Sequence, residues 1–227
     1  MNDTIKKLQY EQLNKDFEFI STTVLYQFAL IEELLENGWQ ETTYEQLILN
    51  EDKIDALETT LLEKIPSLLM LFAPRAAELR KTIAYQEIIL ELEHIGDFLM
   101  DIAEHLKKTD LKSSDYTGFK STLKKILAQL KKTVNTAIFS FFRDDKMQAY
   151  QTIEKEHNIE ILSREITENL VTAFLEIPLT GQDLLNIINL NTITYSLEKI
   201  RQDAISIAKS TIFVTEGIDI KHQRPTG

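Results

Sequence analysis

The sequence predicts an all-α protein built from two tandem three-helix bundles, which gives six long helices and an internal duplication. Three observations favour this class. The 227 residues include only 6 Gly and 4 Pro, too few turn residues for a β-rich or Rossmann-type fold. Leu, Ile, Glu, Lys, Ala and Gln, which suit long helices, are abundant. The hydrophobic fraction of 43% is enough for a sizeable core in one large domain or two small ones.

Turn signals divide the first half into three helical segments. The first segment ends near Asn37 and Gly38, residues that tolerate the left-handed conformation at a helix end. The second begins near Glu41 and carries "NEDKIDALETTLLEKI" before Pro66, which should kink or end it. The third starts around Pro74, a residue favoured in the first helical turn, and runs to about residue 106.

The second half follows the polar stretch "KKTDLKSSDYTG". Two helices come next, with a break near "RDDKM", and a last helix begins after "IPLTGQD" and closes at Gly217. The tail "IDIKHQRPTG" is expected to be mobile. These boundaries predict a first three-helix repeat at residues 1–110, a second at 111–217 and a C-terminal tail at 218–227.

The two halves match when one is laid on the other with a shift of 105 residues and no gaps. Acidic and apolar positions then coincide, which indicates a duplication. We therefore expect two similar bundles arranged in line, with superimposable cores. The matched pairs include Glu51/Glu156, Ile54/Ile159, Glu93/Glu198 and Ile102/Ile207.

The charge and the termini exclude several function classes. A formal net charge of −11 repels phosphate backbones and anionic lipid headgroups, so nucleic acid and membrane surfaces are not expected ligands. The absence of Cys excludes disulfides and thiolate metal sites. The first residues lack the apolar segment of a signal peptide, and no run approaches the roughly 18 apolar residues of a membrane span. A cytoplasmic protein without membrane insertion is expected.

An acidic stripe marks the stretch "LEHIGDFLMDIAE" at residues 92–104. On a helix advancing about 100° per residue, its four acids share one narrow face and the apolar residues lie opposite. A solvated face usually interleaves Lys with Glu, whereas each like-charge pair costs about 0.2–0.5 kcal/mol. A bound cation would remove that repulsion. The four acids are Glu93, Asp97, Asp101 and Glu104.

A second acidic face on the preceding helix completes the predicted site. Glu51, Asp55 and Glu58 share it, and two carboxylate ladders on neighbouring helices can form an all-oxygen site for a hard cation. In the second half the stripe becomes one acid, two neutral residues and one base, so that copy is expected to be degenerate. The predicted metal ligands are Glu51, Asp55, Glu93, Asp97 and Asp101; the second-half equivalents of the stripe are Glu198, Gln202, Ser206 and Lys209.

Two ExxH pairs raise an alternative, a ferritin-like di-iron carboxylate enzyme or metal-storage bundle. They are Glu91 with His94 and Glu154 with His157. Such a site needs both pairs turned inward in equivalent places, but the 105-residue shift does not superimpose them. No phosphate-cradling glycine loop, nucleophile elbow or HExxH motif is present, so an enzyme is not indicated.

Several of these segments resemble the PhoU family, the regulators of bacterial phosphate transport. "LEHIGDFLMDIAE" resembles the family signature "LERIGD...NIAE", "PRAAELR" resembles its "P...DLR" segment, and "NEDKID" resembles its "D..ID" element. In the second half, "LEKIRQDAISIAKSTIFVTEG" resembles a weakened second copy with its closing "TG". The resemblance extends over nearly the whole chain.

The resemblance implies a homodimeric, cytoplasmic, non-enzymatic protein whose ExxxD motifs hold metal ions on the bundle surface. The corresponding pairs are Glu51 with Asp55 and Glu93 with Asp97, while Asp101 stands where the family usually has Asn and His94 where it has Arg. The cation would be iron, zinc, magnesium or manganese. The resemblance also implies a negative regulator of phosphate uptake, which links the ATPase subunit of a phosphate ABC transporter to a sensor histidine kinase.

Overall fold

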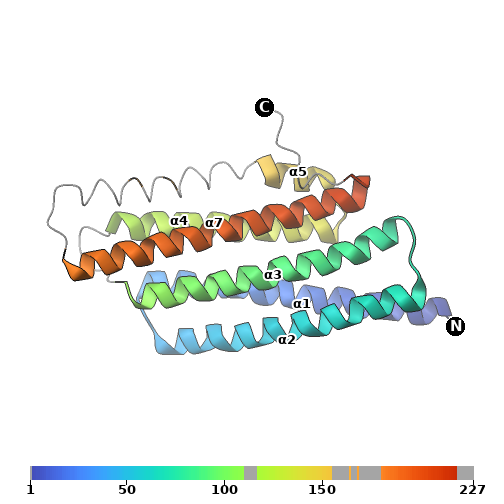
Figure 1. The fold of residues 1–227 in the computed structure, drawn as a ribbon, viewed down its shortest axis with the longest axis horizontal. Helices are drawn as coiled ribbons and strands as arrows, with labels where there is room; N and C mark the ends of the chain where they lie inside the picture. Colours follow the sequence, from blue (N-terminus) through green and yellow to red (C-terminus); the bar gives the residue numbers. More distant parts are fainter. Residues whose placement is uncertain (1, 110–116, 155–163, 165–167, 169–179, 219–227) are drawn as a thin grey trace.

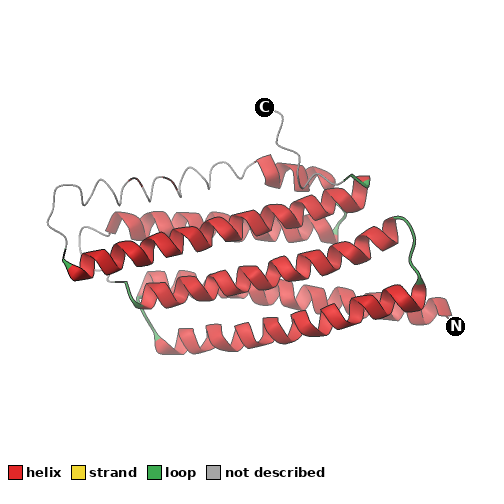
Figure 2. Ribbon diagram, in the orientation of Figure 1, coloured by secondary structure: helices red, strands yellow, loops and turns green. Residues whose placement is uncertain are grey.

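Six helices and no strand make up the described part of the chain (Figures 1 and 2). The computed structural model describes residues 2–109, 117–154, 164, 168 and 180–218. The all-α prediction is therefore confirmed. The helices are α1 (Asn2–Asn37), α2 (Glu41–Phe72), α3 (Ala77–Lys107), α4 (Thr117–Phe142), α5 (Lys146–Glu154) and α7 (Gly181–Glu216).

The helix ends of the first half lie close to their predicted positions, with two differences. Gly38 follows α1 with a φ of +83°, as expected of a residue at a left-handed helix end. Helix α2 does not end at Pro66 but continues to Phe72. Pro66 is exposed, while Ile65 and Leu68 beside it are buried, so core packing maintains the helix across the missing backbone donor. Pro74 precedes α3 by three residues and is not part of its first turn.

The second half also follows the sequence signals. The break at "RDDKM" separates α4 from α5 and contains Asp144 with a φ of +52°. Helix α7 begins with a capping box, in which Asp183 N donates to Thr180 Oγ1 at 3.2 Å and Thr180 N donates to Asp183 Oδ2 at 2.9 Å. It ends at Gly217, with a φ of +72°. Most of the tail expected to be mobile lies outside the described residues.

Helices α3 and α7 lie side by side along most of their length, and α1 packs against α2, α3 and α4 (Figure 1). The first bundle therefore lies alongside the second, and the expected arrangement in line is wrong. One continuous core draws residues from all six described helices. Phe17 of α1, Tyr85 of α3 and Phe141 of α4 meet in it, with the last two rings 4.8 Å apart in a T-shaped contact.

Contacts between the halves also form at the surface. Arg80 of α3 donates from Nε to the carbonyl oxygen of Val214 at 3.3 Å, and its guanidinium lies against Gly217. Lys81 pairs with Asp144 at 2.7 Å. The segments "PRAAELR" and "VTEG", far apart in sequence, thus meet at the C-terminal end of α7. Within the described ranges, no helix combines the length and apolar character that a membrane span requires.

Candidate metal-binding site

The candidate site lies where α2 and α3 pack together. Ile54 of α2 and Ile95 and Leu99 of α3 are fully buried, and they fix the rotation of both helices by facing the core. The intervening acids are therefore held along the edge of the α2–α3 contact. Each helix contributes its ExxxD pair on a single face, because residues four apart are neighbours on a helix surface.

The structure brings all five predicted ligands into one electrostatic cluster, with Asp97 as their common neighbour. The Asp97 carboxylate interacts with Glu51 and Asp55 across the helix contact, and with Glu93 and Asp101 along α3. Glu58 also lies within reach of Glu93. The five carboxylates are thus electrostatic neighbours, but within the described residues no three of them bring ligand atoms within 4.8 Å of one another. Their role as ligands stays a prediction.

Glu51 is the most closely held of these acids. Gln27 of α1, which is fully buried, donates from Nε2 to Glu51 Oε2 at 2.6 Å. A Cβ at Gly96 would lie 3.1 Å from Glu51 Oε2, 3.2 Å from Ile54 Cδ1 and 3.4 Å from Gln27 Oε1. Any larger residue at this position would therefore require the Glu51 carboxylate to shift by a few tenths of an ångström.

Gln27 and Gly96 are the parts of the site that sequence reasoning missed. A glycine in a helix interior costs about 0.5–1 kcal/mol relative to alanine. Its presence within "LEHIGDFLMDIAE" was a usable signal of close approach by another element. Gln27 carried no comparable signal, because a polar residue on a long amphipathic helix is usually solvated.

The surroundings of the carboxylate cluster disfavour its negative charge. Burial is the largest cause and raises the pKa of Glu51 to about 8; the Gln27 hydrogen bond lowers it, and Asp97 and Asp55 raise it. Burial and neighbouring carboxylates also raise the pKa values of Asp55, Glu93 and Asp101. Among the described ion pairs, no Lys or Arg is bound to any of the five predicted ligands.

These residues fit a hard cation. Glu51 Oε1 and Gln27 Oε1 are buried and have no hydrogen-bond partner among the described residues, so each has unused acceptor capacity. The carboxylate set matches the oxygen ligands of magnesium and calcium, and it is also open to manganese, iron or zinc. A cation here would compensate the charge that the surrounding groups leave unbalanced.

In the second half, the position equivalent to Gly96 is occupied by a positively charged side chain. Arg201 stands where the 105-residue shift places Gly96, is only 9% exposed, and donates from Nε to Glu198 Oε2 at 2.8 Å. Burial alone would raise the pKa of Glu198, but the hydrogen bonds and charge of Arg201 bring it below its usual value. This agrees with a degenerate second stripe. Glu156 and Glu160 lie outside the described residues.

Among the ExxH residues that the structure describes, His94 and Glu154 are not turned into the bundle core as a di-iron centre requires. His94 has a side chain that is 54% exposed, and Glu154 is exposed on α5. His157 lies outside the described residues. A di-iron centre needs the ligands of both pairs directed into the bundle core, so the exposed Glu154 speaks against the alternative.

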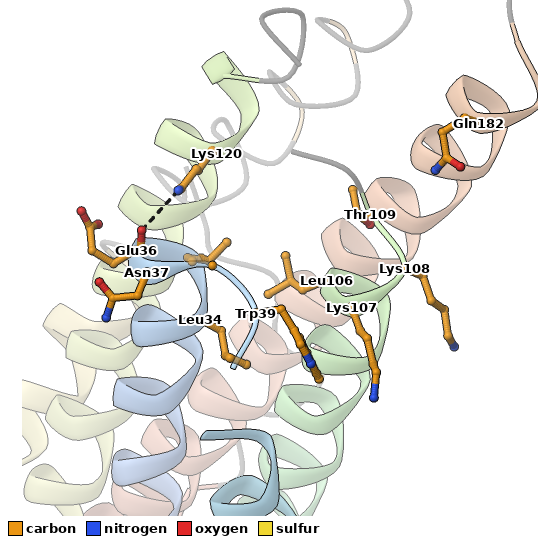
Figure 3. A pocket seen from close by; sticks show the side chains of 12 residues that line it. Leu34, Glu36, Asn37, Trp39, Leu106, Lys107, Lys108, Thr109, Lys120 and Gln182 are labelled. Carbon is orange, nitrogen blue, oxygen red and sulfur yellow. Dashed lines mark hydrogen bonds between the residues drawn. The ribbon is translucent and has the colours of Figure 1, made fainter. Parts of the chain in front are cut away.

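A cleft of about 720 Å³ opens at one end of the bundle, between the α1–α2 turn, the end of α3 and the start of α4 (Figure 3). Its walls include Trp39, Lys107, Lys108 and Lys120. Lys107 pairs with Glu41 at 3.5 Å and lies over the Trp39 ring, while Lys120 donates to the Glu36 carbonyl at 3.4 Å. Its basic lining makes this cleft unsuitable for a cation.

Comparison with known proteins gives a consistent result. The model of the PhoU domain family matches residues 17–106 and again 123–211. The two matched stretches end 105 residues apart, which confirms the internal duplication. In the described part, Ile102 and Ile207 of the matched pairs are both buried in the core.

Two curated relatives cover most of the chain, and both are named phosphate-specific transport system accessory protein PhoU homolog. The one from Aquifex aeolicus is 26% identical over 93% of this chain and 96% of its own length. The one from Pseudomonas aeruginosa is 24% identical over 93% of this chain and 88% of its own length.

Two solved structures share the fold. The crystal structure of PhoU from Pseudomonas aeruginosa superposes with a TM-score of 0.82 at 21% identity, covering 93% of this chain and 99% of the other. The phosphate transport system regulatory protein PhoU from Streptococcus pneumoniae gives a TM-score of 0.76 at 16% identity, with 94% and 98% covered. The predicted helical-bundle fold is thereby confirmed.

Proposed function

The chain belongs to the PhoU family, and from this membership we propose that it is a metal-binding negative regulator of phosphate uptake. The matches to both repeats carry the proposal, because they extend over most of the chain. The prediction that the chain is not an enzyme agrees with the membership, since the curated relatives are named accessory proteins of a transport system.

The regulator acts by contact with other proteins. Its proposed partners are the ATPase subunit of a phosphate ABC transporter and a sensor histidine kinase, and it works as a cytoplasmic homodimer. The net charge of −11 favours partner surfaces that are basic. The names of the relatives support the link to phosphate transport in general, and the individual partners follow from the family resemblance.

The proposed metal ligands are Glu51, Asp55, Glu93, Asp97 and Asp101. When bound, a divalent cation supplies the positive charge that this cluster otherwise lacks. The carboxylates of Glu51 and Asp55 would then hold α2 against the α3 carboxylates, so metal binding would stiffen the first repeat. The unused oxygen of Glu51 and the close approach of its carboxylate to Gly96 support this assignment.

The regulatory role is tested by deleting the gene and following a phosphate-starvation reporter in phosphate-replete cells. Expression of the reporter should rise, because a negative regulator has been removed, and the intact gene should restore repression. A reporter that stays silent after deletion would contradict the phosphate role. Affinity purification from replete cells would identify the transporter and kinase partners.

The metal role is tested with Asp97→Asn. Because Asp97 neighbours all four other ligands, its replacement should lower the amount of bound metal sharply, whereas Gln202→Ala at the equivalent position should leave it unchanged. The melting temperature should fall only when metal is present, because binding to the native state supplies the stabilisation. Equal melting of variant and wild type, with and without metal, would reduce the cluster to a solvated surface.

A further inference from the structure

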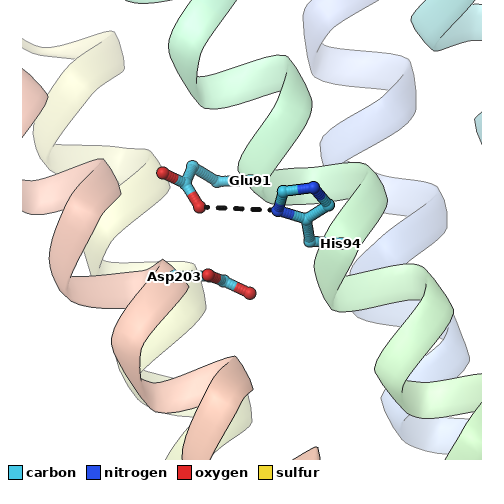
Figure 4. A group of neighbouring side chains, drawn as sticks. All are labelled: Glu91, His94 and Asp203. Atoms are coloured by element: carbon cyan, nitrogen blue, oxygen red, sulfur yellow. Dashed lines mark ion pairs between the residues drawn. The ribbon is translucent and has the colours of Figure 1, made fainter.

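A second group of possible ligands lies in the contact between α3 and α7. Glu91 and His94 of α3 face Asp203 of α7, and one donor atom from each lies within 4.8 Å of the other two (Figure 4). Glu91 precedes Glu93 by two residues, about 200° around the helix. The group therefore occupies a different side of α3 from the carboxylate cluster shared with α2.

The three side chains converge from two helices. Glu91 and His94 are three residues apart and thus adjacent on the helix surface, with His94 Nδ1 at 3.9 Å from Glu91 Oε2. Asp203 comes from the facing helix, and its carboxylate lies beside both (Figure 4). The Glu91 side chain is mostly buried and that of His94 is half exposed, so the group is open to solvent on the His94 side.

The negative charge of the carboxylates in this group is only weakly balanced by neighbouring positive charges and hydrogen-bond donors. Asp203 Oδ2 is buried and has no hydrogen-bond partner among the described residues. Burial, followed by contact with Glu91, raises the pKa of Asp203 to about 8, with Lys199 as an opposing charge. Lys199 Nζ itself lies over the Tyr195 ring at 5.3 Å. Two carboxylates are thus pressed together beside an imidazole.

We propose that Glu91, His94 and Asp203 bind a divalent first-row transition ion, with Zn²⁺ as the best match. Imidazole together with carboxylate oxygens suits zinc and its neighbours better than magnesium or calcium, which prefer oxygen alone. Ligand atoms about 2.1 Å from a common ion lie at most about 4.2 Å apart, so small side-chain rotations suffice. The solvent-exposed side leaves a position for water.

This site would have a different structural effect from the one between α2 and α3. Glu91 and His94 belong to the first repeat and Asp203 to the second, so the ion fastens the two repeats to each other. Its occupancy would stiffen the long α3–α7 contact, along which the two halves of the molecule are joined. The inference does not depend on the role in phosphate uptake.

The test counts zinc ions per chain by equilibrium dialysis and atomic absorption. Asp203→Asn and His94→Gln should each lower the count by about one ion, since each removes one of three protein ligands. His105→Gln, a histidine on the same helix whose ring bonds Asn189, is the matched control and should bind as wild type. Asp97→Asn should remove a different ion. The double variant with Asp97→Asn and Asp203→Asn should therefore lose both zinc ions.

Two results would overturn the proposal. Asp203→Asn could retain all the zinc of the wild type. Alternatively, His94→Gln could lower the zinc count while Asp203→Asn does not. His94 would then bind zinc together with Glu93, because Glu93 Oε2 lies 3.9 Å from His94 Nε2. If Asp97→Asn left the zinc count unchanged while Asp203→Asn lowered it, the α2–α3 site would be refuted and this one would stand, so the two failures are distinguishable.

Folding is checked independently of the ion count. Without metal, Asp203→Asn should melt no lower than wild type, because it relieves a carboxylate pair. Zinc should raise the melting temperature of wild type more than that of the variant. In the wild-type chain, zinc should also shift the NMR resonances of the His94 ring, and a ring that stays unchanged during the titration would contradict the proposal.

Discussion

Gly96 and Glu51 show how one small residue shapes the candidate metal site. The missing side chain at Gly96 lets the Glu51 carboxylate from α2 lie against the backbone of α3, where Gln27 also holds it by a hydrogen bond. The second repeat has Arg201 at this position, and its guanidinium binds Glu198. At this one position, arginine supplies a positive charge to the carboxylate of the second repeat, whereas glycine supplies none to those of the first.

Replacing Gly96 by Ala should weaken metal binding by about tenfold, equivalent to about 1.4 kcal/mol. The new Cβ would lie 3.1 Å from Glu51 Oε2 and displace that carboxylate. Stability should change little, because the helix gains about 0.5–1 kcal/mol from alanine while the crowding opposes it. Titration calorimetry measures the affinity. Gly181→Ala is the control, since its Cβ would meet nothing within 4 Å; equal affinity in both variants would refute the argument.

The stability of the metal-free protein should decrease as the pH rises from about 5 to 8. The folded state raises the pKa of Glu51 from 4.5 to about 8, so its contribution is complete below pH 4.5 and is lost as the pH passes through 8. Glu51→Gln should flatten this dependence, although Asp203, with a pKa also about 8, leaves part of the slope. Urea unfolding in the presence of a chelator measures it.

The control for the pH experiment is Glu45→Gln, which removes an exposed carboxylate from the same helix. This variant should keep the slope of the wild type. A Glu51→Gln protein whose stability changes with pH as steeply as that of wild type would show that the Glu51 carboxyl is ionised in the folded state.

At the scale of the element, the two ends of α7 are fixed by different means. Thr180 and Asp183 close its N-terminus locally through their capping box. The C-terminus depends on tertiary structure, because Arg80 of α3 donates to the Val214 carbonyl and lies against Gly217. A cation at a helix C-terminus also interacts favourably with the helix dipole.

Arg80→Ala should destabilise the protein by about 1 kcal/mol, through loss of a charge-assisted hydrogen bond and of the dipole interaction. Chemical denaturation measures the change in the free energy of unfolding. Arg75→Ala, which removes an exposed arginine just before α3, should have a smaller effect. If both substitutions cost the same, Arg80 does not cap α7 in solution.

At the scale of the whole molecule, the two repeats share a core and should unfold together. Phe141 of the second repeat is fully buried against Phe17 and Tyr85 of the first. Truncating it to Ala should cost about 3–5 kcal/mol. Trp39, the only tryptophan, belongs to the first repeat and reports on its unfolding by fluorescence.

In Phe141→Ala the Trp39 transition should shift together with the loss of helical circular dichroism, because coincident probes mark a single cooperative unit. Wild type should likewise show one transition by both methods. A Trp39 transition that stays at its wild-type midpoint, while the helical signal splits in two, would mean that the repeats unfold separately.

The sequence by itself determined the helical class, the duplication and the faces of the acids. These are local or periodic properties: helix ends follow from residues such as Gly38 and Gly217, and a 3.6-residue period sets which side chains share a face. The five predicted ligands could therefore be named before their neighbours were known. The continuation of α2 past Pro66 could not be predicted from the sequence, because the packing of buried neighbours outweighs the tendency of proline to end a helix.

Only the tertiary structure decided which faces meet. It placed Gln27 beside Glu51, brought Arg80 to the end of α7, and set the two bundles side by side instead of in line. It also brought Asp203 to Glu91 and His94, a group that neither half contains by itself. Such contacts depend on how helices distant in sequence pack their apolar faces, and periodicity within one helix carries no information about its partner.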